Sequence, residues 1–170
     1  MIYRIHIICI LLLCGILPAQ DGGGGDPGRD QIAQVEVTVY HATNADPAAA
    51  GAVGRPATAD EVRRLSADES MRFEHYQRLG QDQQPLLRSY ESWAEPLRPS
   101  DEVLLRFEAQ GRADDISAVL DLELWLARKK ILKLDARLDA EKPLYVLGPN
   151  WRDGRLIIAI QLVESKAADS

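Results

Sequence analysis

Residues 118–138 read AVLDLELWLARKKILKLDARL, and this stretch decides the fold. Leucine alternates with other residues on both sides of the basic segment 127–130. Alternation with a period of two is typical of a strand that buries one face. We therefore predict an antiparallel hairpin with one continuous apolar face, formed by Leu120, Leu122, Leu124, Leu126, Leu132, Leu134, Ala136 and Leu138.

The opposite face of this hairpin is charged. Opposite charges across an antiparallel pair contribute about 0.2–1 kcal/mol each, so we expect cross-strand ion pairs on a solvent-exposed face. Trp125 falls on this face rather than in the core, because it shares the alternation of the charged residues. The face consists of Asp121, Glu123, Trp125, Lys133, Asp135 and Arg137.

The rest of the chain repeats the strand pattern in short runs. Val35, Val37 and Val39 alternate with polar residues and predict a first strand. Residues 156–160 are apolar on both sides, which predicts a central strand covered on both faces. Residues 71–79 suit either a helix or a strand, and we predict a strand. Further strands are expected at 86–93, 102–110, 143–147 and 155–163.

One helix and two connections interrupt the strands. Thr58 and Glu61 form a capping box, which predicts a helix over 59–69 that caps an end of the domain or covers a sheet edge. Residues 42–57 lack any period and predict a loop. Asp153 and Gly154 offer the positive φ of a tight hairpin. These elements predict a mainly β, antiparallel sandwich-like domain with one short helix after the first strand.

The amino terminus has the layout of a secretory signal peptide. Arg4 precedes an apolar run over 5–17, which stops short of the roughly 20 residues that span a membrane. We predict a signal peptide at 1–19, a flexible glycine-rich tether at 20–31, a single β-rich domain at 32–165 and a disordered tail at 166–170. The mature chain is then exported, periplasmic or secreted, without a membrane span. An uncleaved anchor and lipidation at Cys14 are the alternatives.

Composition narrows the classes of function. The formal net charge is −6, which disfavours binding to nucleic acid. Both cysteines, Cys9 and Cys14, lie in the predicted signal peptide, so no disulfide is expected. His41 and His75 are far apart in sequence and match no zinc or hydrolase motif, although a zinc site made with carboxylates after folding is an alternative. We expect no enzyme activity and no cofactor.

The aromatic residues are the remaining functional signal. Tryptophan and tyrosine contribute large contact areas with few rotamers to freeze. We expect a protein–protein interaction or structural component of a cell-envelope assembly, with an open sheet edge as one mode of contact. A carbohydrate-binding module is the alternative, and an unusual hydrolase is the third hypothesis. The candidate partner or glycan contacts are Trp93, Trp125, Trp151 and Tyr145.

Overall fold

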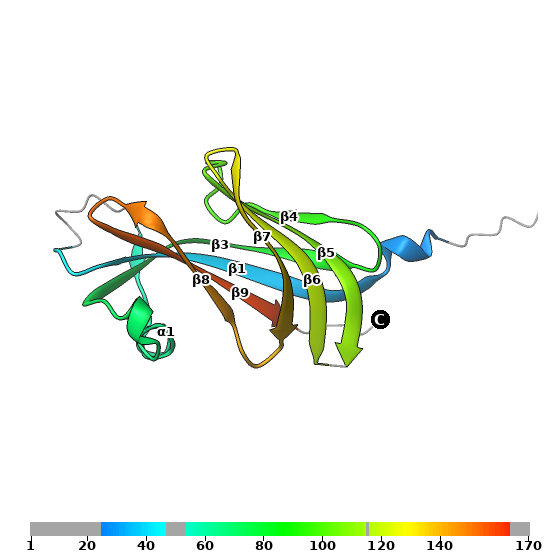
Figure 1. Ribbon diagram of the computed structural model, residues 1–170, viewed down its shortest axis with the longest axis horizontal. Coiled ribbons are helices and arrows are strands. Elements are labelled where there is room, and N and C mark those ends of the chain that lie inside the picture. The colour runs from blue at the N-terminus through cyan, green and yellow to red at the C-terminus, as the bar shows by residue number, and fades with distance from the viewer. Residues whose placement is uncertain (1–24, 47–53, 115, 164–170) are drawn as a thin grey trace, which may run out of the picture.

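The computed structural model describes residues 25–46, 54–114 and 116–163. Within these ranges the chain forms two antiparallel sheets packed face to face, with one α-helix (Figure 1). The mainly β, sandwich-like prediction is confirmed. The predicted signal peptide and the predicted tail at 166–170 lie outside the described residues.

The first sheet has five strands and the second has four. The first runs in the order β2 (Arg55–Pro56), β3 (His75–Leu87), β1 (Gln31–Thr43), β9 (Gly154–Val163) and β8 (Leu144–Trp151). The second runs in the order β4 (Ser92–Ala94), β5 (Val103–Asp114), β6 (Ser117–Leu126) and β7 (Lys129–Asp139). The helices are η1 (Pro27–Arg29), α1 (Ala59–Leu65) and η2 (Glu69–Met71). No helix in the described ranges has the length and apolar character needed to cross a membrane.

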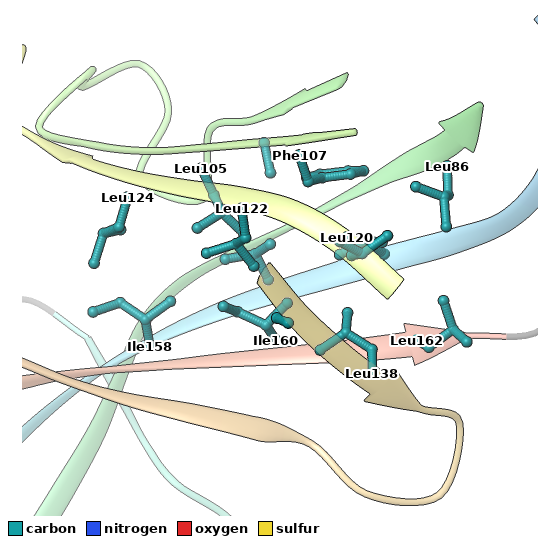
Figure 2. Packing of buried hydrophobic residues seen from close by; sticks show 14 of the residues in the cluster. Leu86, Leu105, Phe107, Leu120, Leu122, Leu124, Leu138, Ile158, Ile160 and Leu162 are labelled. Carbon is teal, nitrogen blue, oxygen red and sulfur yellow. The ribbon is translucent and has the colours of Figure 1, made fainter. Parts of the chain in front are cut away.

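The core lies between the two sheets. Leu120, Leu122 and Leu124 on β6 are completely buried and face the aliphatic side chains of β1 and β9, among them Ile158 and Ile160 (Figure 2). The predicted apolar face of the hairpin is confirmed, although its β7 members Leu132 and Leu134 are only partly buried. These two leucines are less buried because β7 is the edge strand of its sheet and has a neighbouring strand on one side only.

Strand β9 is covered on both faces, as its sequence predicts. It lies between β1 and β8. Ile158 and Ile160 face the other sheet, while Ile157 packs on the opposite side in a second apolar cluster. That second cluster is where the helix docks.

Helix α1 lies at one end of the domain, as expected, and there it covers part of the outer face of the five-stranded sheet (Figure 1). Leu65 and Met71 join Tyr40, Tyr76 and Ile157 in the second cluster. The position follows from β1 and β9, which carry large apolar side chains on the outer face as well as the inner one. The helix buries that second apolar surface.

The helix and its neighbours also differ from the predicted boundaries. The capping box of Thr58 and Glu61 is confirmed, but α1 ends at Leu65 and a separate 3-10 turn follows from Glu69. The predicted strand at 71–79 begins only at His75, and the predicted strand at 86–93 is divided between β3 and β4. The described part of the predicted tether carries η1, and the Gly28 carbonyl accepts a hydrogen bond from the Ser89 amide at 3.0 Å.

Two hairpins use non-glycine residues with positive φ. Ala127 and Arg128 have φ of 46° and 64°, and Arg152 and Asp153 have φ of 44° and 59°. The second turn therefore lies one position before the predicted Asp153–Gly154 pair. Gly154 is required for a different reason, since a Cβ there would overlap the Ala42 carbonyl oxygen and the His41 ring.

A buried carboxylate fixes α1 to the sheet. Glu61 accepts hydrogen bonds from the Tyr40 hydroxyl at 2.8 Å and the Thr58 amide at 2.7 Å, and it forms an ion pair with Arg78. Burial alone raises the pKa of Glu61, but the bonds from Arg78, Thr58 and Tyr40 outweigh it and lower the pKa to about 2. Burial and the bond to Glu61 raise the pKa of Tyr40.

Leu124→Ala tests the inter-sheet core. We expect the free energy of unfolding to fall by about 2–5 kcal/mol, because a fully buried leucine is replaced by a cavity. Ile131→Ala on the same hairpin is the matched control. Its side chain is 46% exposed, so the loss should stay below about 1 kcal/mol in the same urea titration. Equal losses would contradict the assignment of the two faces.

Glu61→Gln tests the helix clamp. We expect the free energy of unfolding at neutral pH to fall by about 2 kcal/mol, because Arg78 loses its charged partner. The folded pKa lies below the ordinary 4.5, so the stabilisation is present above pH 4.5 and disappears as the pH falls toward 2. In Glu61→Gln the free energy of unfolding should no longer fall for this reason between pH 4.5 and 2. The exposed control Asp60→Asn should keep this fall. An unchanged acid profile in Glu61→Gln would show that another group causes it.

Candidate functional site

Two of the four candidate aromatic residues meet on the outer face of the four-stranded sheet. Trp93 lies on β4 and Trp125 on β6, and their rings face each other across β5 with centroids 6.0 Å apart and planes inclined by 51°. The alternation of both strands forces this orientation, since Ala94 and Leu124 point into the core. Trp93 is 37% exposed and Trp125 is partly buried.

Hydrogen bonds hold both indoles in place. The Trp93 ring N–H donates to Glu91 and the Trp125 ring N–H donates to Glu123, each at 3.2 Å. The ammonium of Lys130 lies 5.5 Å from the centre of the Trp125 ring, a cation–π geometry. The tryptophans therefore keep few rotamers to lose when a ligand binds them.

A continuous ion network surrounds the two rings. Arg106 on β5 binds Glu91, Glu108 at 2.8 Å and Asp121 at 3.3 Å. Lys133 binds Asp121 at 3.0 Å, and Lys130 binds Glu123 at 3.1 Å. We call the whole group the tryptophan platform, which comprises Trp93, Trp125, Glu91, Arg106, Glu108, Asp121, Glu123, Lys130 and Lys133.

The charged face is exposed at Lys133, Asp135 and Arg137, as expected, but not at Glu123. Glu123 is only 6% exposed, because it lies beneath its hydrogen-bond donors Lys130 and Trp125. The hydrogen bond from Lys130 lowers the pKa of Glu123, and that from Lys133 lowers the pKa of Asp121. The lowered pKa favours the ionised form of both carboxylates, which accepts hydrogen bonds from the neighbouring donors.

The other two candidate aromatics lie elsewhere. Trp151, at the end of β8, packs its ring edge against His41 at 5.3 Å and donates its ring N–H to Glu102 at 3.2 Å. The guanidinium of Arg152 lies 4.4 Å from the centre of the Trp151 ring. Tyr145 is partly buried beside α1, where burial raises its pKa. The structure thus brings together Trp93 and Trp125 but not Trp151 and Tyr145.

Trp151 forms part of the wall of two open pockets. One, of about 570 Å³, is bordered by Asn44, Phe73 and Arg155. The other, of about 430 Å³, is bordered by Asp82 and by residues 95–98. Neither pocket has a histidine in its lining.

The histidines are not placed as metal ligands. His41 is completely buried in β1, with its Nε2 3.1 Å from the Trp151 carbonyl oxygen, and His75 is exposed at the start of β3. Among the residues that the structure describes, no group of three or more histidine, cysteine, aspartate or glutamate side chains could hold a metal ion.

The sequence did not indicate the residues that complete the platform. Asp121, Glu123, Trp125 and Lys133 were predicted to share a face, but Arg106 and Glu91 were not, because they come from β5 and from the connection before β4. Only the order of the strands brings them together. Comparisons with protein-family models, with curated proteins and with solved structures found no match to this chain.

Paired indoles give an exciton couplet in far-ultraviolet circular dichroism, and this signal reports the platform directly. We expect Trp93→Phe and Trp125→Phe each to remove the couplet, and Trp151→Phe to retain it, because only the first two rings lie within 6.0 Å of each other. The pKa of Glu123 is lowered, so the couplet should persist below the usual pKa of a glutamate. A couplet that survives Trp125→Phe would contradict the pairing.

Proposed function

We propose that this protein is an exported, non-enzymatic protein-binding domain of a cell-envelope assembly, and that the tryptophan platform is its contact surface. The observation that carries the proposal is the pair of partly exposed indoles fixed by carboxylates on a sheet face. Tryptophan and arginine are enriched among residues that dominate binding energy, and rigid side chains lose little entropy when they bind. The charged groups around the rings supply orientation and specificity.

Export is supported by the sequence of the first 19 residues, with a basic start, an apolar run and small residues before Gln20. The absence of cysteine after residue 14 is compatible with an extracytoplasmic location, because the core is large enough to fold without disulfides. The platform carboxylates are paired with cations rather than kept protonated, which favours binding over acid–base catalysis.

Carbohydrate binding at Trp151 is the second candidate. Its support is the pair of open pockets that share this tryptophan and are lined by amide, carboxylate and guanidinium groups from Asn44, Asn150, Asp82 and Arg152. An aromatic ring beside polar groups that fix orientation is the usual composition of a small-ligand site. This site is separate from the platform, so the two candidates are tested independently.

A photo-crosslinking amino acid at position 93 or 125 tests the protein-binding proposal. In intact cells that make the tagged full chain, we expect both positions to give the same specific protein adduct. Position 90 is the matched control, since Tyr90 is also an exposed aromatic but its hydroxyl bonds to Asp26 rather than to the platform. Trp93→Ala should abolish the adduct formed from position 125.

Adducts of equal yield from all three positions, or no adduct from 93 and 125, would contradict the proposal. The carbohydrate candidate is tested by glycan titration of Trp151→Phe and Trp93→Phe with intrinsic fluorescence. A response that disappears only in Trp151→Phe would support the pocket site, and its absence in the unsubstituted chain would remove that candidate.

A further inference from the structure

Strand β7 is a long edge strand. It spans Lys129–Asp139 and pairs with β6 on one side only (Figure 1). On the other side the one β-bridge in the described residues joins Asp139 to Lys142, where the chain leaves the strand. An edge of this length presents unpaired backbone groups to any strand that can add to it.

The sequence of β7 is complementary to itself when read backwards. Residues 133–139 are Lys-Leu-Asp-Ala-Arg-Leu-Asp. The outward side chains Lys133, Asp135, Arg137 and Asp139 alternate in sign along the strand, while Leu134, Ala136 and Leu138 point inward. Reversing the segment places an anion opposite each cation and an apolar residue opposite each apolar residue.

We propose that β7 pairs antiparallel with β7 of a second copy of this chain, with Ala136 opposite Ala136 on the two-fold axis. In this register Asp135 lies opposite Arg137 of the second copy. Lys133 falls at the level of Asp139, where the added strand ends, because the outer side of Asp139 is already bridged to Lys142. Because the two copies are related by a two-fold axis, each of these contacts occurs twice, and the same surface of both copies forms the interface. Leu134 is opposite Leu138, which covers a leucine that is only partly buried in the single chain.

Charge selects this register over its neighbours. Pairing centred on Asp135 would place Asp135 against Asp135 and Lys133 against Arg137, both repulsive. Pairing centred on Leu134 would keep Lys133 against Asp135 and place Asp139 against Lys129, but it would place Arg137 against the apolar Ile131. The register centred on Ala136 is the one in which every facing pair of this segment is complementary.

Asp135 has an unfavourable environment within the single chain. Its direct cross-strand neighbour on β6 is Asp121, a like charge, and it is exposed. It makes no ion pair with another described residue, whereas Asp121 is already bound by Arg106 and Lys133. Arg137, which binds Asp139 of its own chain at 3.3 Å, would supply from the second copy the cation that Asp135 lacks.

A sheet edge that only prevents association would carry a different charge pattern from that of residues 133–139. Protective edges commonly carry lysine, which makes two copies repel each other. β7 begins with two such lysines, but residues 133–139 alternate cations with anions, so this segment of two copies is complementary in one register. The exposed Ile131 and the apolar pocket of about 400 Å³ between the start of β7 and β8 add apolar surface along the same edge.

Charge reversal with rescue tests the dimer. We expect the full chain to show a concentration-dependent monomer–dimer equilibrium in sedimentation velocity. Asp135→Arg and Arg137→Asp should each weaken dimerisation roughly tenfold or more, since each turns two attractive pairs into repulsive ones. The double variant restores opposite charges and should recover dimerisation. Asp135→Arg places a cation opposite Asp121, so the fold itself should not be lost.

Cysteine cross-linking tests the register. In a chain with Cys9 and Cys14 replaced by alanine, Ala136→Cys should form a disulfide-linked dimer on mild oxidation, and Leu134→Cys should form much less. A chain that stays monomeric at all concentrations, single variants that dimerise as the unsubstituted chain does, or a double variant without recovery would overturn the proposal. Preferential linkage through position 134 would overturn the register.

Discussion

The packing of the β6 leucines against the aliphatic side chains of β1 and β9 is the interaction on which the rest of the structure depends. The described residues contain no cysteine, and they form no cluster suited to a metal ion. Burial of apolar surface between the sheets therefore has to provide the main driving force for folding. It also fixes the register, because a slip by one residue would turn the leucines to solvent and the charges to the core.

The inner faces of the two sheets form the core, and their outer faces differ from each other. On the five-stranded sheet, apolar side chains bind α1, and Glu61 fixes the helix through Tyr40, Thr58 and Arg78. On the four-stranded sheet, no helix covers the outer face in the described structure, and Glu123 is shielded by Trp125 and Lys130 instead. Both faces bury a carboxylate beneath several donors, and on the second face one of these donors is the indole of Trp125.

The features that the sequence predicted are those set by local alternation. The leucines of 118–138 and the valines of 35–39 correctly predicted buried faces. Strand β3 was harder, since its glutamine-rich centre has no apolar period and its pairing with β1 decides its length. Gly154 is needed because a side chain there would overlap β1. This contact joins residues far apart in the sequence, so no local pattern could predict it. Within the platform, Trp125 was placed on the correct face, but its contact with Trp93 depends on β4 and β6 both flanking β5.

The platform and the edge strand belong to one sheet, so the proposed binding surface and the proposed dimer contact share one frame. Neighbouring antiparallel strands are related by a two-fold axis perpendicular to their sheet, so a dimer formed through β7 keeps both outer faces on the same side. Two copies of Trp93 and Trp125 would then lie on one continuous eight-stranded surface. Such a surface would engage a repeated or symmetric partner at two points, and the second contact would be intramolecular. Modest affinity at each platform would suffice for firm attachment, provided that the spacing of the partner's sites matches that of the platforms.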